Sequence, residues 1–266
     1  MIDKKVIIVT GASRGIGYST AALFLKKGHK VYAFSRSGCD LEGINSIICD
    51  VTDEISLKKA IDSVFEAEKR IDVLINNAGA GISGAVEKTA EADARKLFEL
   101  NFFAYFEAIK YAVPYMRKQK SGKIINIGSV AGAMHVPFQA FYSASKAAVE
   151  ALSNCLRGEL APFGIKVSTV MPGDTRTGFT GAREKDFLEN DPDYGMRISR
   201  SIKMMEEDER KGMPPQKAAK VIYKAASCKN PKPAYVAGFS YNFFMFLNKV
   251  LPKRFVQFVL NSMYSK

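Results

Sequence analysis

A tyrosine and a lysine stand four positions apart in the stretch FYSASKAAVE, residues 141–150. Four residues span just over one helical turn, so Tyr142 and Lys146 would lie on one face of a helix. A phenol has an unperturbed pKa of about 10, and a neighbouring ammonium favours the phenolate and lowers that pKa. The pair is therefore a candidate proton-transfer group with a cation that tunes it. The alternative is an amphipathic helix with a half-buried tyrosine and a solvated lysine.

Three glycines follow the first apolar run, in VIIVTGASRGIGYSTAALFLKKG. Gly11 permits a tight turn after a strand, whereas Gly15 and Gly17 let the backbone approach a pyrophosphate and let a helix pack on the sheet. The helix that begins near Gly15 offers unpaired N–H groups and the positive end of its dipole to an anion. The segment predicts a dinucleotide-phosphate site, with a tight turn that binds nothing as the alternative.

Short β-branched runs alternate with longer segments of helical period. Strands are predicted at 6–10, 30–34, 46–49, 73–75, 123–127, 166–170 and 234–236. Helices are predicted at 16–27, 55–68, 90–118, 141–161 and 215–226. The alternation predicts an α/β fold: a doubly wound parallel sheet with helices on both faces.

Two regions break this alternation. Residues 175–213 are polar and long for a connection, which is typical of a lid or binding element. Residues 239–266 are rich in aromatic side chains, carry lysine and arginine, and contain no acidic residue. We expect a catalytic domain over 1–238, including the lid, and a hydrophobic basic extension over 239–266. The extension either packs on the protein or a second subunit, or rests on an anionic membrane as a peripheral contact.

Composition excludes several classes of protein. With four cysteines that lack paired ligand spacing and only two histidines, no metal site is expected. Reduced thiols and a cytoplasmic location are expected. The net charge of +12 permits phosphate, nucleic-acid or membrane partners. No basic run is interleaved with aromatic residues, so we expect no nucleic-acid partner.

Seven motifs, taken in order, resemble those of the short-chain dehydrogenase/reductase family in its single-domain branch, over roughly residues 4–237. The resemblance implies a Rossmann-type sheet of seven parallel strands. It also implies hydride transfer between a nicotinamide cofactor and a carbonyl carbon, and a homodimer or homotetramer formed through the long helices. The motifs are TGASRGIG at 10–17, Asp50 with Val51, NNAG at 76–79, Asn101, Ser129, YSASK at 142–146 and PGDTRT at 172–177.

The resemblance assigns roles to four catalytic residues. Tyr142 is the general acid/base, and Lys146, together with the positive nicotinamide ring of the oxidised cofactor, lowers its pKa and binds the ribose hydroxyls. Ser129 would orient the substrate oxygen, or else is only a turn residue at a strand end. Asn101 would hold a water that relays protons from the lysine, or else is a satisfied core amide.

The end of the second strand bears on which cofactor is bound. An acidic residue there would bind the ribose 2′-hydroxyl of NAD, but the sequence has Ser35 followed by Arg36. With Arg14 in the glycine turn, two guanidinium groups are available to a 2′-phosphate, unless both are solvated surface charges. We therefore predict NADP(H) rather than NAD(H).

The remaining cofactor contacts follow from the resemblance. Asp50 and Val51 would lie at the adenine, unless Asp50 is only a cap. Pro172 and Gly173 would turn beneath the nicotinamide, and the Thr175 backbone would bind the carboxamide. The full predicted cofactor-binding set is Gly11, Ser13, Arg14, Gly15, Ile16, Gly17, Ser35, Arg36, Asp50, Val51, Asn77, Ala78, Gly79, Tyr142, Lys146, Pro172, Gly173, Thr175 and Thr177.

Apolar residues flank the tyrosine and favour a hydrophobic small-molecule carbonyl or alcohol substrate. A hydroxysteroid or lipid-like ketone is preferred over two alternatives. One is a reductase of small aldehydes, ketones or sugars, and the other is a catalytically weak NADP-binding redox sensor. The flanking residues are Met134, Val136, Pro137, Phe138 and Phe179.

Overall fold

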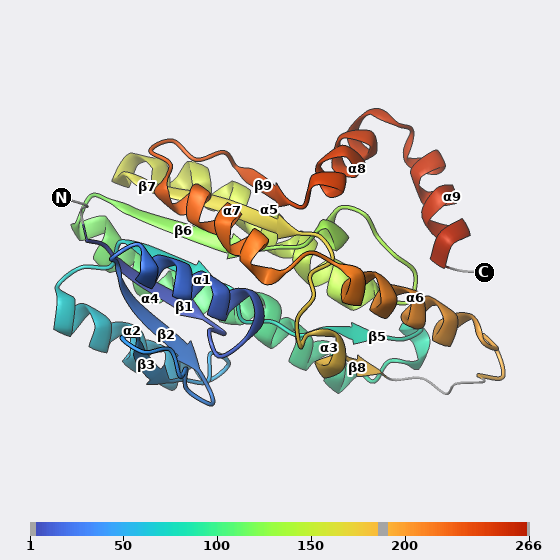
Figure 1. Ribbon diagram of the computed structural model, residues 1–266, viewed down its shortest axis with the longest axis horizontal. Coiled ribbons are helices and arrows are strands. Elements are labelled where there is room, and N and C mark those ends of the chain that lie inside the picture. Colours follow the sequence, from blue (N-terminus) through green and yellow to red (C-terminus); the bar gives the residue numbers. More distant parts are fainter. Residues whose placement is uncertain (1–3, 186–190, 265–266) are drawn as a thin grey trace.

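The computed structural model of the chain describes residues 4–185 and 191–264 and contains a parallel sheet of seven strands (Figure 1). The strand order is β3-β2-β1-β4-β6-β7-β9, and every neighbouring pair is parallel. This confirms the predicted fold class, with strand ends displaced by a residue or two. The strands are β1 (Val6–Thr10), β2 (Lys30–Ser35), β3 (Asn45–Ile48), β4 (Val73–Asn76), β6 (Gly122–Ile127), β7 (Ile165–Pro172) and β9 (Ala234–Ala237).

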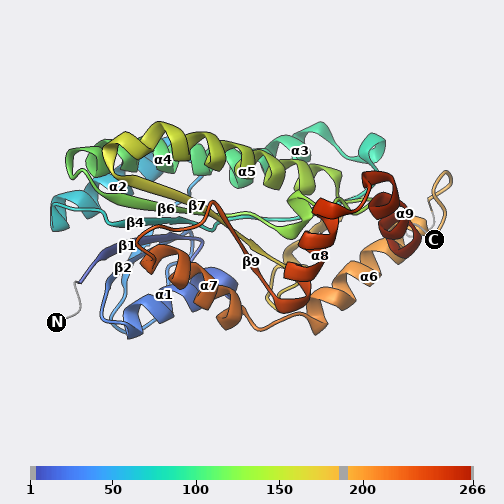
Figure 2. The same cartoon turned by 90° about the horizontal axis from the view of Figure 1, so that it is seen from above.

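Helices cover both faces of the sheet (Figure 2). One face carries α2 (Glu54–Glu68), α4 (Ala104–Lys118) and α5 (Ala140–Leu160), and the other carries α1 (Gly15–Lys26) and α7 (Pro215–Ser227).

The two apolar cores follow from the alternation of side chains along each strand. Ile7 and Val9 of β1 are buried with Phe24 and Ile222 on the side of α1 and α7. Ile8, between them, is buried in the core formed with α2 and α4. Because both faces are covered, β1 is apolar and buried throughout, as expected for a central parallel strand.

The predicted helix over 90–118 is wrong in one respect, because it is not a single α-helix. It consists of α3 (Glu91–Phe98), a π-helical turn (Glu99–Phe103) and α4. A π turn widens the helix locally and is common at functional sites. Here it contains Asn101, whose side chain is completely buried.

The lid region 175–213 has more regular structure than its polar sequence suggests; its residues 186–190 lie outside the described part of the chain. A short strand, β8 (Glu184–Lys185), pairs with β5 (Ile82–Ser83), and helix α6 (Arg197–Lys211) follows. The helix was not predicted, although it buries apolar side chains at helical spacing. These are Ile198, Ile202 and Met205.

The chain end forms two further helices, α8 (Phe239–Val250) and α9 (Lys253–Tyr264), and α9 lies beside α6 (Figure 2). The Tyr241 hydroxyl donates to a carboxylate oxygen of Asp174, directly after β7. The Tyr264 hydroxyl donates to Asp208 Oδ2 of α6 at 2.9 Å. One face of the extension is therefore packed on the protein, which was one of the two alternatives left by the sequence.

Candidate active site

The carboxyl ends of the central strands bring the sequence motifs together at one edge of the sheet, where parallel α/β folds bind their ligands. The glycine turn follows β1, the NNAG motif begins in the last residue of β4, and Ser129 lies two residues after β6. The PGDTRT motif begins at the last residue of β7, and α5 carries Tyr142 and Lys146.

The glycine turn has the backbone geometry that a pyrophosphate site needs. Gly11 and Gly15 have φ angles of +65° and +61°, in the left-handed region that glycine adopts without strain. A Cβ atom on Gly17 would lie 2.2 Å from the Gly11 carbonyl oxygen, so only glycine fits. Arg14 caps α1 without a side-chain hydrogen bond, and the first turn holds no acidic residue. The N-terminus of α1 therefore suits an anion, and the turn fits a dinucleotide cofactor.

Asn77 holds this turn against the neighbouring strand. Its side-chain amide donates to the carbonyl oxygens of Thr10 (2.9 Å) and Gly11 (3.1 Å). Its backbone N–H donates to the Thr10 hydroxyl at 2.9 Å. These bonds make Asn77 a structural clamp, and leave its neighbours Ala78 and Gly79 as the predicted backbone surface beneath a cofactor.

Arg36 is exposed just beyond the end of β2. It lies near Asp50: burial acts to raise the pKa of this carboxyl, but hydrogen bonds from Thr52 and the Arg36 charge lower it on balance. The buried Ser35 hydroxyl donates to the Gly38 carbonyl at 2.8 Å. Asp50 accepts from the Thr52 hydroxyl and N–H, as a cap would.

A polar cleft lies beside these residues, and most of its lining was not predicted from the sequence. Ser13 was predicted, whereas the segment just after Arg36 was not, although its position after the second strand is the signal that could have found it. The cleft is lined by Ser13, Ser37, Gly38, Cys39, Asp40 and Ser46.

Ser129, Tyr142 and Lys146 meet at the carboxyl end of β6. The Ser129 hydroxyl lies near enough to the Tyr142 phenol to lower its pKa, and it accepts from the Ala131 N–H at 3.1 Å. The Lys146 Nζ atom donates to the Ile127 carbonyl oxygen at 3.0 Å. It lies 5.9 Å from the centroid of the Tyr142 ring. The spacing prediction for this pair is met, but Lys146 is buried rather than solvated.

The electrostatics of this group differ from the sequence expectation. Burial lowers the pKa of Lys146 from 10.5 to about 7. Burial also raises the pKa of Tyr142 to about 12; the Ser129 hydrogen bond and Arg183 oppose this shift, and Glu209 and Asp174 add to it. In the protein without a cofactor, burial therefore outweighs the expected lowering of the Tyr142 pKa, and the phenol keeps its proton at neutral pH. The lowering that the positive nicotinamide ring would add stays a prediction.

Asn101 acts on the loop after NNAG rather than on the tyrosine directly. Its Oδ1 atom accepts from the Ala80 N–H at 2.9 Å, and its Nδ2 atom donates to the Ala80 carbonyl (3.0 Å) and to Ser145 Oγ (3.1 Å). Asn101 is therefore a buried amide whose hydrogen bonds are satisfied, which was one of the two roles expected for it. The other role, holding a water that relays protons from the lysine, stays a prediction. A Cβ atom on Gly79 would lie 3.1 Å from Asn101 Oδ1 and 3.5 Å from Lys146 Nζ, so glycine permits this close packing.

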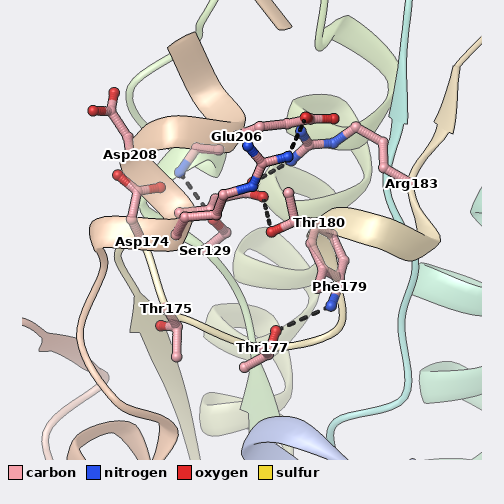
Figure 3. A network of polar contacts seen from close by, with 12 residues as sticks. Ser129, Asp174, Thr175, Thr177, Phe179, Thr180, Arg183, Glu206 and Asp208 are labelled. Carbon is pink, nitrogen blue, oxygen red and sulfur yellow. Dashed lines mark hydrogen bonds and ion pairs between the residues drawn. The ribbon is translucent and has the colours of Figure 1, made fainter. Parts of the chain in front are cut away.

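The segment after β7 runs from Asp174 past Thr175 and Thr177 to Phe179 (Figure 3). Thr177 packs against Gly15 and accepts a hydrogen bond from the Phe179 N–H at 3.2 Å. The Thr175 hydroxyl donates to the Gly173 carbonyl at 2.8 Å. Phe179 lies with its ring centroid 5.7 Å from that of Tyr142 and forms an aromatic wall beside the phenol.

A buried polar network behind Phe179 was missed by the sequence analysis (Figure 3). Arg183 has no exposed side-chain surface and pairs with Glu209 of α6. The Thr180 hydroxyl donates to the same carboxylate at 2.6 Å. Burial raises the pKa of nearby Asp174. Little in the sequence points to this network. Arg183 stands in a polar stretch like any surface arginine, and its partner Glu209 is 26 residues further along the chain.

The apolar residues predicted to form a substrate wall have different contacts in the structure. Val136 and Phe138 pack with the buried face of α6, and Phe138 meets Tyr194 edge-on at 5.8 Å between ring centroids. They help to hold α6 on the domain, and the substrate wall predicted at these two positions stays a prediction. Of the predicted apolar side chains, Phe179 is the one in ring contact with Tyr142 among the described residues.

Comparisons with known proteins agree with this geometry. A family model for short chain dehydrogenases matches residues 5–187. A 3-ketodihydrosphingosine reductase from Bacteroides thetaiotaomicron is 43% identical over 232 residues, 86% of each chain. An NADPH-dependent 3-dehydrocapnine reductase from Ornithobacterium rhinotracheale is 32% identical and also covers 86% of each chain. The crystal structure of a short-chain dehydrogenase from Streptomyces avermitilis superposes with a TM-score of 0.83 at 32% identity, covering 92% of each chain.

Tyr142→Phe tests the proton donor. The variant keeps the ring that packs on Phe179 but lacks the proton, so carbonyl reduction should fall by about 10²- to 10⁴-fold while cofactor binding is retained. Turnover and a cofactor titration measure the two effects. Tyr115→Phe, whose hydroxyl bonds Asp62 far from the site, serves as the control. Near-normal turnover in Tyr142→Phe would defeat the assignment.

Lys146→Met tests the burial of the lysine. Because the pKa of Lys146 is lowered on folding, the unfolded chain binds a proton that the folded chain lacks between pH 7 and 10.5. The stability of the unsubstituted protein should therefore rise with pH in this window, by up to about 1.4 kcal/mol per pH unit relative to the variant. Urea unfolding without cofactor measures it, with the exposed Lys59→Met as control. A stability difference that does not change with pH would contradict the buried site.

Proposed function

Because the chain belongs to the short-chain dehydrogenase/reductase family, we propose that it reduces the ketone of a lipid-like substrate with NADPH. The observation that carries the proposal is the position of the Tyr142 phenol, which lies beside Ser129, Lys146 and the ring of Phe179. Membership of the family makes the protein an oxidoreductase; the substrate class and the phosphorylated cofactor are our inference.

The chain's own residues divide the proton chemistry among them. Ser129 lies where its hydroxyl would hydrogen-bond the substrate carbonyl oxygen and keep it facing the phenol. Tyr142 donates its proton to that oxygen, which becomes the alcohol hydroxyl. Lys146, fixed by the Ile127 carbonyl, would stabilise the phenolate that remains, as an ammonium or as a neutral hydrogen-bond donor. The bound dihydronicotinamide would supply the hydride to the carbonyl carbon.

The residues around the glycine turn favour the 2′-phosphorylated cofactor. Arg36 follows β2 where an acidic residue would otherwise select NAD, and the cleft beside it presents the hydroxyls of Ser13 and Ser37. Asp40 also lines this cleft, and its carboxylate would repel a phosphate. Binding of the 2′-phosphate would therefore need the positive charge of Arg36 to outweigh this repulsion.

A long-chain ketone is the substrate class that fits best. The chain is similar to proteins named 3-ketodihydrosphingosine reductase and NADPH-dependent 3-dehydrocapnine reductase, and the first name specifies the ketone of a sphingoid lipid base. In this structure Phe179 is packed beside Tyr142, which suits an apolar chain next to the reacting carbonyl.

Arg36→Asp tests the cofactor preference. Loss of a charge-assisted phosphate contact should weaken NADPH binding by about 10- to 100-fold and leave NADH binding nearly unchanged. Fluorescence titration with both cofactors measures the affinities. Lys118→Asp, the same charge change on an exposed site of α4, controls for net charge. Equal losses of affinity for both cofactors, or no loss, would contradict the assigned role.

A series of ketones of increasing chain length tests the substrate class. With NADPH in excess, kcat/KM should rise by about fourfold for each methylene added until the apolar site is filled. Steroid ketones and ketoses of comparable reactivity complete the panel. Turnover confined to sugars, or a rate independent of chain length, would overturn the lipid-ketone assignment while leaving the oxidoreductase assignment intact.

A further inference from the structure

We propose that the outward face of α8 and α9 docks on the surface of an anionic lipid bilayer. This aromatic face consists of Phe239, Phe243, Phe246, Val250, Phe255 and Phe258. The proposal rests on the exposure and charge of these helices, and it holds whichever ketone the enzyme reduces.

Helix α8 has two distinct faces. Tyr241, Met245 and Asn248 recur at helical spacing and face the protein: Met245 is buried, and Asn248 donates to the Ala133 carbonyl at 3.3 Å. The opposite stripe, at positions 239, 243, 246 and 250, is apolar throughout and exposed. The side chain of Phe239 is 97% exposed and that of Phe246 is 59% exposed. Apolar area of this kind on one face usually marks an interaction surface.

Helix α9 repeats the arrangement. Leu260 is buried and Tyr264 bonds α6, whereas Phe255 and Phe258, three residues apart, are 53% and 67% exposed. The two helices therefore present exposed phenylalanines on the sides that do not contact the protein.

The charge of the extension is of one sign. Residues 239–264 contain no acidic residue, and Lys249, Lys253 and Arg254 are all exposed. The carboxylates that approach these helices, Asp174 and Asp208, are bonded to Tyr241 and Tyr264 on the inner side. An apolar face flanked by lysine and arginine alone matches anionic headgroups above an acyl layer.

The charge also argues against self-association through this face. In a two-fold dimer the same surface of both copies forms the interface. The basic side chains Lys249, Lys253 and Arg254 would then meet only other basic side chains of this face, with no carboxylate to pair them. A bilayer rich in anionic lipid has the opposite charge and the required apolar depth.

The helices would lie in the plane of the membrane surface. Across the described residues, no helix is long and apolar enough to cross a bilayer. Each of α8 and α9 has 12 residues, or about 18 Å of helix, whereas the hydrocarbon core is about 30 Å thick.

The extension is joined to the active-site edge of the sheet. A Cβ atom on Gly173 would lie 2.1 Å from the Tyr241 ring, so this ring packs directly on the segment that leaves β7. Tyr264 ties α9 to the lid helix α6. A membrane bound to the aromatic face would therefore lie against the lid side of the site, where a ketone dissolved in the bilayer could enter.

Co-sedimentation of the full chain with vesicles tests the proposal without substrate or cofactor. We expect binding to phosphatidylcholine vesicles that contain phosphatidylglycerol, and at least tenfold weaker binding to pure phosphatidylcholine, which lacks the anionic charge, with added salt removing the difference. No binding to either vesicle would overturn the proposal.

Two sets of variants separate the apolar and charged contributions. Phe246→Ser with Phe258→Ser should reduce binding to anionic vesicles by about 50-fold or more. The matched control, Ile55→Ser with Phe163→Ser, replaces exposed apolar side chains of α2 and of the turn after α5 and should bind normally. The triple variant Lys249→Gln, Lys253→Gln, Arg254→Gln should reduce binding to anionic vesicles alone. The matched variant Lys59→Gln, Lys118→Gln, Lys229→Gln, at exposed positions elsewhere, should reduce it much less.

Two further measurements keep the outcome unambiguous. The Phe246→Ser, Phe258→Ser variant should reduce a water-soluble ketone at the normal rate, which shows that it is folded and that the reductase assignment stands on its own. Sedimentation velocity should give the same mass for this variant and the unsubstituted protein. Unchanged vesicle binding, or a mass that falls in the variant, would overturn membrane docking, and the second result would assign the face to another copy of the chain.

Discussion

The burial of Lys146 is the constraint on which the catalytic site depends. Its amine is held by the Ile127 carbonyl at the end of β6, and it lies 5.2 Å and 5.9 Å from the ring centroids of Tyr105 and Tyr142. Burial disfavours the charged form and moves the pKa of the lysine to about 7. Strand β6, helix α5 and the π turn before α4 must all be in place for this amine to sit beside the phenol.

The π turn is part of the same arrangement. It places Asn101 so that both ends of its amide bond the Ala80 backbone, and Gly79 leaves room for Asn101 and Lys146 to approach. The loop that follows β4 is thus held from one side by Asn101 and from the other by Asn77, which also clamps the glycine turn. The candidate cofactor surface and the candidate catalytic residues are therefore positioned by hydrogen bonds to the same loop.

Further polar contacts join α6 and the two C-terminal helices to the segment that follows β7. Arg183 and Thr180 bond Glu209 of α6, Asp174 bonds Tyr241 of α8, and Asp208 bonds Tyr264 of α9. A carboxylate that is withdrawn from water loses solvation energy unless a partner group bonds it. Each of these three carboxylates therefore stabilises the position of the segment that carries its partner. The proposed membrane face is consequently held in a defined place relative to Tyr142.

The sequence by itself determined the sheet, the glycine turn and the Tyr142–Lys146 pair, because each depends on short-range spacing: apolar strands, left-handed glycines and residues one helical turn apart. Only the tertiary structure decided the π turn at Asn101, the Arg183–Glu209 pair and the position of α8 and α9, because these depend on contacts between distant segments. It also decided the environment of this pair. A lysine near a tyrosine in sequence indicates a lowered pKa, but in the protein without a cofactor desolvation raises the pKa of the partly buried phenol and lowers that of the buried amine.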